Sequence, residues 1–290
     1  GRLSCGSCHQ PAHAYADGAA ISAPDGEPRQ RRNSMSLINV AYRPTLGWDG
    51  AALTLEEQIE NSFSPWGDMG LGVADALARI SADEDYVRQC REAYATDVDA
   101  RCLTYAIAAF ERSLVSSGSR FDRFLFAREE AALTASERRG WDLFNGRAGC
   151  INCHDVFHPS VNALGGAYAT FSDERFHNLG AGYGEGRMRD TGRYEITRDA
   201  EEHGAFKTPM LRNVALTAPY MHDGSFDTLE SVIEFYNEGG RRNPRQSRGL
   251  RPLFLTAEEE ADIVAFLRAL NSDYPVPTGG RGHAGRRRAE

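Results

Sequence analysis

The sequence predicts a mainly α-helical protein with two domains, and three observations support this. Apolar residues recur at three- and four-residue spacing over several stretches, which is the pattern of amphipathic helices, whereas signals for β-strands are scarce. The motif C-x-x-C-H occurs twice, at residues 5–9 and 150–154, and so divides the 290 residues into two parts. The length agrees with this division, because single domains commonly have about 100–200 residues.

The helical pattern is clearest in five places, and two of these helices begin at a recognisable cap. Three of these stretches lie at residues 54–61, 76–94 and 100–116. Thr134 and Glu137 form a capping box ahead of the next helix, and Thr256 and Glu259 repeat that arrangement further along the chain. The last helix is expected over about residues 257–270.

The boundary between the two domains is predicted within FDRFLFAREEAALTAS, at residues 121–136. An N-terminal domain then covers residues 1–130 and a C-terminal domain residues 131–275. Residues 276–290 are rich in Pro, Gly and Arg and lack an apolar period, so a disordered tail is expected there. The Gly-rich residues 179–195 are expected to form a long loop, because their glycines do not follow a predicted strand.

The two C-x-x-C-H motifs indicate covalent haem attachment. Each thiol can take one haem vinyl group as a thioether, and the histidine that follows can reach the iron from the same face. A zinc site would need further ligands at suitable spacing, and a redox dithiol does not need the histidine. The sequence therefore predicts two c-type haems with histidine as the proximal iron ligand. Their attachment residues are Cys5, Cys8 and His9 for the first haem, and Cys150, Cys153 and His154 for the second.

Charge and composition restrict the partners and the compartment. The net charge of −8, without a basic face before the end of the chain, argues against a nucleic-acid partner. No run of 18 apolar residues is present, so no membrane span is predicted. The sequence opens almost at the first haem motif, and we expect an export signal to have been removed ahead of it. Bacterial c-type haem is attached after export, which favours a periplasmic location.

Cys90 and Cys102 are the two cysteines outside the haem motifs. They lie on either side of a TDVD break between two helical stretches. Adjacent antiparallel helices could bring them within bridging distance, and an oxidising compartment would preserve the bond. A disulfide is the favoured interpretation, and two small buried apolar side chains are the alternative.

Two long stretches outside the motifs resemble a known family. They are RNSMSLINVAYRPTLGWDGAALTLEEQIENSFSPWGDMG at residues 32–70 and FKTPMLRNVALTAPYMHDGSFDTLESVIEFYNEGG at residues 206–240. Both are similar to stretches of the bacterial dihaem cytochrome c peroxidases, a family that includes the MauG-like enzymes. The resemblance runs from Cys5 to about Leu270. It implies two cytochrome-c-like domains, with one haem each, packed around an inter-domain calcium ion.

The same resemblance implies roles for four further residues. Trp48, in GWDG, occupies the position of a tryptophan that bridges the two haems and relays electrons, with plain core packing as the alternative. The calcium ligands would be the side chain of Asn33 and the backbone carbonyls of Thr217 and Pro219, since neutral oxygen ligands suit this cation. Without the resemblance, Thr217 and Pro219 would be interpreted as a turn and Asn33 as a cap.

The first haem is expected to react with hydrogen peroxide. The family places a glutamine and a glutamate ten and twenty residues after the bridging tryptophan, and here these positions hold Gln58 and Asp68. Such groups move the peroxide proton from the near oxygen to the leaving one. Asp68 is one methylene shorter than the usual glutamate, and a polar loop residue is the alternative. Residues 19–34 contain no histidine that could block this iron, so a five-coordinate or water-ligated haem is expected.

Tyr236 distinguishes between the functions that the resemblance allows. The family's cytochrome c peroxidases place a methionine there, on the second iron, whereas MauG-like members place a tyrosine. A Met/His pair raises the potential and suits electron entry from a small cytochrome. A phenolate stabilises ferric iron, so that haem can store an oxidising equivalent. Packing within a helical apolar stripe is the alternative role of Tyr236.

We therefore expect a MauG-like enzyme in which Tyr236 ligates the second iron opposite His154. Hydrogen peroxide would produce a high-valent, bis-ferryl type state that oxidises side chains, chiefly tryptophan, of a partner protein. The first alternative is a cytochrome c peroxidase that draws electrons from a small redox protein. The second is a dihaem electron carrier, in which Gln58 and Asp68 would have no purpose over a capped iron.

Other residues near the motifs are assigned less specific roles. His177 and His222 are interpreted as hydrogen-bonded structural residues rather than iron ligands. MauG-like enzymes can release oxidising equivalents through a tryptophan two residues before the second haem motif, where this chain has Ala148. An exit path would then use other aromatic residues, such as Trp141 or nearby tyrosines.

Overall fold

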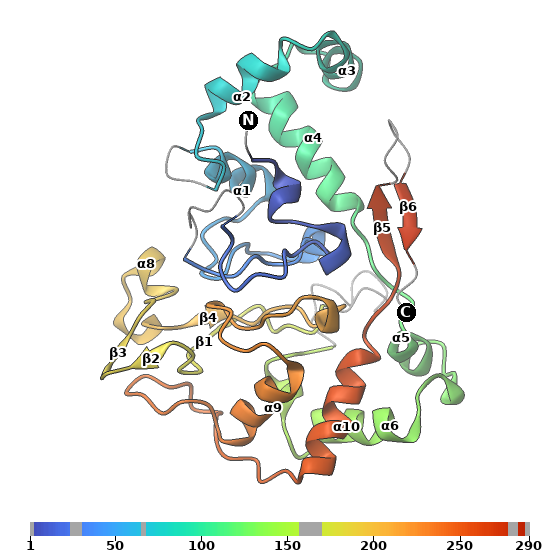
Figure 1. Cartoon of the computed structure of the whole chain (residues 1–290), viewed down its shortest axis with the longest axis vertical. Coiled ribbons are helices and arrows are strands. Elements are labelled where there is room, and N and C mark those ends of the chain that lie inside the picture. Colours follow the sequence, from blue (N-terminus) through green and yellow to red (C-terminus); the bar gives the residue numbers. More distant parts are fainter. Residues whose placement is uncertain (1–2, 24–30, 65–67, 157–169, 278–283, 288–290) are drawn as a thin grey trace.

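The computed structural model describes residues 3–23, 31–64, 68–156, 170–277 and 284–287, and it is mainly helical, as predicted (Figure 1). The α-helices are α1 (Leu55–Ser62), α2 (Val73–Ile80), α3 (Glu84–Tyr94), α4 (Ala100–Ser113), α5 (Arg120–Leu125), α6 (Ala135–Asn145), α8 (Tyr194–Thr197), α9 (Leu229–Asn237) and α10 (Ala257–Arg268). Short 3₁₀ turns, among them η1 (Cys5–Ser7), η3 (Val40–Tyr42) and η5 (Cys150–Asn152), lie between them.

Strands within the described residues are short and form antiparallel pairs. The pairs are β1 (Phe176–His177) with β4 (Phe206–Lys207), β2 (Tyr183–Gly184) with β3 (Arg187–Met188), and β5 (Tyr274–Pro277) with β6 (Ala284–Arg287). The β2–β3 hairpin and the start of α8 lie inside the stretch expected to be a long loop. The two hairpin residues Glu185 and Gly186 both have positive φ, of 52° and 77°, which is the backbone of a type I′ hairpin turn.

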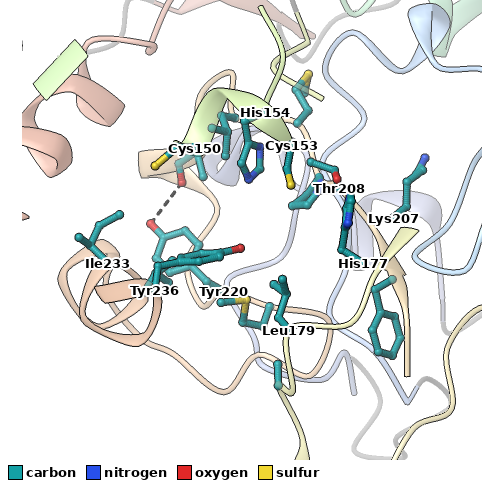
Figure 2. A pocket seen from close by; sticks show the side chains of 18 of the residues that line it. Cys150, Cys153, His154, His177, Leu179, Lys207, Thr208, Tyr220, Ile233 and Tyr236 are labelled. Atoms are coloured by element: carbon teal, nitrogen blue, oxygen red, sulfur yellow. Dashed lines mark hydrogen bonds between the residues drawn. The ribbon is translucent and has the colours of Figure 1, made fainter. Parts of the chain in front are cut away.

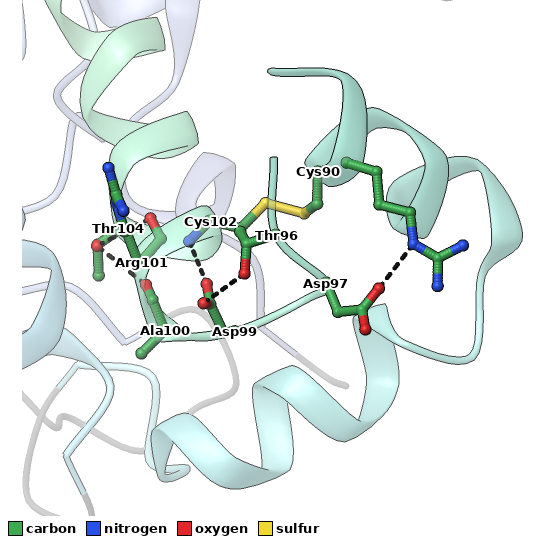
Figure 3. The surroundings of a disulfide bond; sticks show 9 residues. Cys90, Thr96, Asp97, Asp99, Ala100, Arg101, Cys102 and Thr104 are labelled. Atoms are coloured by element: carbon green, nitrogen blue, oxygen red, sulfur yellow. Dashed lines mark hydrogen bonds and ion pairs between the residues drawn. A yellow bond between two sulfur atoms is a disulfide. The ribbon is translucent and has the colours of Figure 1, made fainter. Parts of the chain in front are cut away.

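Helices α1 to α4 form the upper part of the molecule in Figure 1. Their apolar faces meet in a core built from Val40, Leu46, Ala52, Leu55, Ile59, Phe63, Ala76, Leu103 and Ala108. Cys90 of α3 and Cys102 of α4 form a disulfide with their Cα atoms 5.8 Å apart (Figure 3). The predicted bridge is thereby confirmed. Asp99 caps α4 by accepting a hydrogen bond from the Cys102 N–H at 2.7 Å.

Helices α6, α9 and α10 form the lower part of Figure 1, where α6 packs along α10. Both predicted capping boxes are present, at Thr134 ahead of α6 and at Thr256 ahead of α10. The two helices approach very closely at Gly140, since a Cβ there would lie 2.0 Å from the Asp262 carbonyl oxygen. Among the described residues this core is larger than that of the upper part, and it includes Trp141, Phe144, Phe171, Ile233, Ile263 and Phe266.

Two segments near the predicted boundaries behave differently from expectation. Phe121 of α5 is completely buried in the core of the C-terminal part, although it precedes the predicted boundary at residue 130.

Part of the expected disordered tail forms β6 and pairs with β5. The reason is local anchoring of β5: the Tyr15 hydroxyl donates to the Pro275 carbonyl at 2.6 Å, and the Tyr274 hydroxyl to that of Pro11 at 2.9 Å. The fixed strand then offers backbone groups for pairing.

Buried ion pairs connect segments far apart in the sequence. Arg212 is fully buried and forms a two-fold hydrogen bond to Asp122 of α5, at 2.6 and 3.0 Å. Arg32 reaches Asp49 at 2.5 Å and Asp190 at 2.7 Å. Charges of this kind are tolerated in a protein interior only when they are paired. Among the described helices, none is both long and apolar enough to cross a membrane.

Candidate functional site

The two C-x-x-C-H motifs adopt the same turn. In the first, the His9 N–H donates to the Cys5 carbonyl at 2.9 Å, and in the second the His154 N–H donates to the Cys150 carbonyl at 2.8 Å. Each begins in a short 3₁₀ turn, η1 or η5. Gly149 starts the second turn in the left-handed region, with φ of 68°, which glycine adopts without steric cost. The four motif cysteines are free thiols, as thioether formation requires.

Both motif histidines are oriented by a backbone carbonyl. Nδ1 of His9 donates to the Tyr15 carbonyl at 2.9 Å, and Nδ1 of His154 donates to the Phe171 carbonyl at 2.9 Å. This bond fixes the tautomer and leaves Nε2 as the metal-binding atom. Burial lowers the pKa of both histidines, that of His154 to about 4. Both rings are therefore neutral, which is the form that ligates iron.

The second motif opens onto a large cavity of about 580 Å³, a volume typical of small-molecule and cofactor sites. Figure 2 shows Cys150, Cys153 and His154 on one side of it and Tyr236 with Ile233 on the opposite side. Two thiols for the vinyl groups, an oriented imidazole and apolar walls are what a c-type haem needs. The residues of this cavity therefore fit a haem.

Tyr236 lies on α9, in the helical stripe noted in the sequence, and lines this cavity. Burial raises the pKa of its phenol. Tyr220 lines the same cavity, but its hydroxyl donates to the Val214 carbonyl at 3.2 Å. No described residue hydrogen-bonds to the Tyr236 hydroxyl. Of these two tyrosines, Tyr236 is thus the one whose oxygen is available to an iron held by His154.

Asp68 contacts the end of α1 through Ser62. Ser62 Oγ lies 3.1 Å from Asp68 Oδ2 and 3.1 Å from the backbone carbonyl of Gln58. Burial is the main cause of the raised pKa of Cys5 and of the lowered pKa of His9, and the charge of Asp68 makes a smaller contribution that raises both. Asp68 is therefore within electrostatic reach of the first motif. We expected no histidine from residues 19–34 to block the first iron. Part of that segment, residues 24–30, lies outside the described ranges.

A second carboxyl group near the first motif was not identified from the sequence. Glu111, on α4, contributes to the raised pKa of Cys5, and burial raises the pKa of Glu111 itself to about 7. In the sequence, Glu111 precedes Arg112 in an otherwise ordinary amphipathic helix, so nothing there signals its position.

Trp48 and the three residues predicted to bind calcium line the same cavity as His154. The indole Nε1 of Trp48 donates to the Asn33 carbonyl at 2.8 Å. The Asn33 side-chain amide donates to the Ala19 carbonyl at 2.8 Å, which leaves its side-chain oxygen as the group that can face a cation. Thr217 and Pro219 border the cavity on the segment before α9.

His177 and His222 occupy the wall of the cavity with other partners. Nε2 of His177 lies 2.8 Å from Asp173 Oδ2, and this hydrogen bond, with a further contribution from Cys153, raises the pKa of His177 to about 10. The ring of His222 stacks on Phe206, with centroids 3.6 Å apart, and burial lowers the pKa of His222.

Known proteins share this sequence and architecture. A family profile described as di-haem cytochrome c peroxidase matches residues 1–130. The cytochrome-c peroxidase IdrP1 of Denitromonas iodatirespirans is 36% identical over 307 residues, covering 95% of this chain and 78% of that protein. The methylamine utilization protein MauG of Methylorubrum extorquens is 32% identical over 275 residues, covering 94% and 74%.

The chain belongs to the di-haem cytochrome c peroxidase/MauG family. Solved structures agree with this. A MauG-like protein associated with microbial copper homeostasis superimposes with a TM-score of 0.81 at 34% identity, covering 93% of this chain and 84% of that one. The diheme peroxidase BthA from Burkholderia thailandensis gives 0.73 at 26% identity, covering 93% and 81%. The protein is therefore a peroxidase-type oxidoreductase, and membership of this di-haem family implies two c-type haems.

Three charged residues beside Trp48 were also missed in the sequence. Arg43, Glu174 and Lys207 form a buried cluster, defined by the contact of Arg43 Nη2 with Glu174 Oε2 at 3.2 Å and of Lys207 Nζ with the same oxygen at 4.0 Å. Lys207 is the only lysine in the chain. A lone lysine in an Arg-rich sequence was the signal that could have drawn attention to this group.

Proposed function

We propose that the protein is a MauG-like enzyme that uses hydrogen peroxide to oxidise side chains, chiefly tryptophan, of a partner protein in the periplasm. The observation that carries this proposal is the pairing of Tyr236 with His154 across one cavity. When bound, the two haems supply two metal centres from which peroxide can remove one electron each.

At the second centre, we assign His154 and Tyr236 as the two residues that would hold the metal. A phenolate oxygen is a charged, electron-donating ligand, so it favours the oxidised metal and makes this centre a poor entry point for electrons. The phenol has a raised pKa because it is buried, and it must release its proton on binding a metal. The bound cation supplies the charge that stabilises the phenolate.

At the first centre, we assign proton transfer to Asp68 and Gln58. Cleavage of the O–O bond needs a proton moved from the near oxygen of peroxide to the far oxygen, which leaves as water. A carboxylate can accept and return that proton, and an amide can orient the peroxide by hydrogen bonding. Ser62, within 3.1 Å of Asp68, would hold the shorter aspartate side chain in position.

Between the centres, we assign Trp48 the role of electron relay and Asn33, Thr217 and Pro219 the role of calcium ligands. The oxidising equivalents would then leave to the partner protein, which loses two electrons and two protons while peroxide becomes two molecules of water. In place of the tryptophan absent at Ala148, the structure offers an aromatic contact to the second centre. Phe144 lies 6.4 Å from His154 and 6.1 Å from Trp141, measured between ring centroids.

The second candidate function is a cytochrome c peroxidase, which the 36% identity to IdrP1 favours. In that case the second centre would accept electrons from a small redox protein. The residue at position 236 distinguishes the two functions, because a methionine ligand raises the reduction potential of the second centre whereas a phenolate lowers it.

The experiment that tests the proposal replaces Tyr236 with Met in the haem-loaded protein and follows both activities. We expect Tyr236→Met to lose oxidation of partner-protein tryptophans, detected by mass spectrometry after peroxide treatment, and to gain peroxide-dependent oxidation of a small cytochrome. Tyr220→Phe is the matched control, since it removes a phenol oxygen from the same cavity wall and should leave the absorption spectrum of the second haem unchanged. Partner modification at the native rate in Tyr236→Met would reject the proposal.

A further inference from the structure

The cluster of Arg43, Glu174 and Lys207 contains more buried positive charge than its own residues neutralise. The side chains are 6%, 5% and 1% exposed, respectively, and two cations share one carboxylate. Burial lowers the pKa of both Arg43 and Lys207, and for Lys207 the neighbouring charge of Arg43 lowers it further. A buried charge without a partner is unfavourable, so a second anion would stabilise this group.

Arg43 also has hydrogen-bonding capacity that the described residues do not use. Its Nη2 donates to Glu174 Oε2 at 3.2 Å and to the Thr208 carbonyl at 2.9 Å. Its Nε–H is buried and has no partner among the described residues, and neither have the nearby Thr45 hydroxyl and the second oxygen of Glu174. A buried donor of this kind is uncommon in native proteins and indicates that a ligand or ion completes the site.

The cluster borders the second haem cavity. Arg43, Lys207 and Thr208 all line that cavity, and the positive charge of Arg43 contributes to the low pKa of His154. Figure 2 shows Thr208 and Lys207 together at one edge of it, away from Tyr236. A group bound in the cavity can therefore meet Arg43.

Carboxylates of the protein near the cluster already have other partners. Asp49 pairs with Arg32 at 2.5 Å, and Asp173 pairs with His177 at 2.8 Å. Of the described residues, these two carboxylates are therefore not free to supply the second anion, and a ligand can supply it. Arginine has a planar fork of N–H donors that matches a carboxylate, and it keeps its charge when buried.

We propose that Arg43 binds a carboxylate in this cavity, and that the carboxylate is a propionate of the haem attached to Cys150 and Cys153. Lys207 is the second cation of the cluster, held by Glu174 and by the carbonyl of Thr45. The cluster thereby sets the position of one edge of the haem next to Trp48, whose carbonyl accepts a hydrogen bond from the Lys207 N–H at 2.8 Å. The proposal rests on haem binding in this cavity and not on which substrate is oxidised.

The test compares Arg43→Gln, Arg43→Lys and Arg175→Gln in the haem-loaded protein. Arg175 is exposed and lies next to Glu174 in the sequence, so Arg175→Gln removes a charge from the same segment without touching the cavity. The readouts are the propionate bending bands in the resonance Raman spectrum and the ferric/ferrous equilibrium of the second haem.

We expect Arg43→Gln to shift one propionate band and to move the ferric/ferrous equilibrium at least tenfold toward ferric iron, which is ~59 mV for one electron. Arg43→Lys should restore part of both effects, and Arg175→Gln should produce neither. Unchanged propionate bands in Arg43→Gln would overturn the proposal, even if the ferric/ferrous equilibrium moved. The charge of Arg43 could then shift that equilibrium from a distance, without contact with a propionate.

A measurement on the unaltered protein covers the case in which Arg43→Gln fails to retain haem. Because Lys207 is the only lysine, labelling with ¹⁵Nζ-lysine gives a single side-chain amine signal. With a propionate in place, Glu174 and the propionate balance the charges of Arg43 and Lys207. We then expect Lys207 Nζ to have the chemical shift of a charged ammonium at neutral pH. A neutral amine in the haem-loaded protein would overturn the proposal, since the cluster would then lack its second anion.

Discussion

The indole Nε1 of Trp48 donates a hydrogen bond to the backbone carbonyl of Asn33 at 2.8 Å. The backbone N–H of Asn33 in turn donates to the His222 carbonyl at 2.6 Å. A residue proposed as an electron relay is thus attached to a residue proposed as a calcium ligand. Any movement of the Asn33 backbone changes the position of the indole in the wall of the second haem cavity.

Removal of calcium should therefore impair communication between the two haems. We expect a chelator to slow oxidation of the partner protein at least tenfold, because the relay residue Trp48 is displaced. The first haem should still react with peroxide, because its site is not displaced. Stopped-flow absorbance and partner mass spectrometry would measure the two steps separately. Activity should return with calcium and not with magnesium, which demands a smaller, octahedral site. Full partner oxidation without calcium would contradict the coupling of Trp48 to Asn33.

Substitution of Asp68 should affect the opposite step. We expect Asp68→Asn to slow the reaction with peroxide by ~100-fold or more, because an amide cannot take up and return the peroxide proton. Asp68→Glu supplies the matched control, since it restores a carboxylate at the length usual in the family. Rapid mixing with peroxide would give both rates, and an unchanged rate in Asp68→Asn would remove this residue from the mechanism.

Trp141 should matter for the delivery of oxidising equivalents. It stacks on Phe144, which lies next to His154, and it occupies the core between α6 and α10. We expect Trp141→Phe to slow partner oxidation about tenfold or more while the peroxide reaction keeps its native rate, because phenylalanine retains the packing but is much harder to oxidise. Equal rates of partner oxidation in the two proteins would show that the equivalents leave by another route.

Glu111 should make stability depend on pH near neutrality. Its pKa is raised from 4.5 to about 7 in the folded protein because the carboxyl is buried. The folded state then holds a proton that the unfolded state has lost, so the free energy of unfolding falls as pH rises from about 4.5 to 7. We expect Glu111→Gln to remove this decrease, which amounts to ~3 kcal/mol at most.

Urea unfolding at pH 5 and pH 8 would measure the effect of Glu111→Gln. Glu60→Gln, at an exposed glutamate of α1, is the matched control and should change the two values equally. The burial of Glu111 would be disproved if Glu60→Gln and Glu111→Gln showed the same dependence on pH.

Much of the fold could be predicted because its signals are local. A capping box needs residues three positions apart, and both boxes, at Thr134 and Thr256, are present in the structure. A disulfide between neighbouring helices needs two cysteines on either side of a short break, and Cys90 with Cys102 meets that condition. The haem motifs are equally local, since two thiols and an imidazole must share one turn to reach the same ring.

The sequence by itself thus determined the helices, the positions of the two C-x-x-C-H motifs and the family resemblance, whereas the tertiary structure decided what surrounds them. The Tyr15 and Phe171 carbonyls that orient the two histidines are backbone atoms, which every residue has, so no sequence pattern marks them. Arg43 and Glu174 lie 131 residues apart and meet only because the chain folds back along Trp48. Burial, and with it each altered pKa and each unmatched charge, is a property of that packing and not of any segment alone.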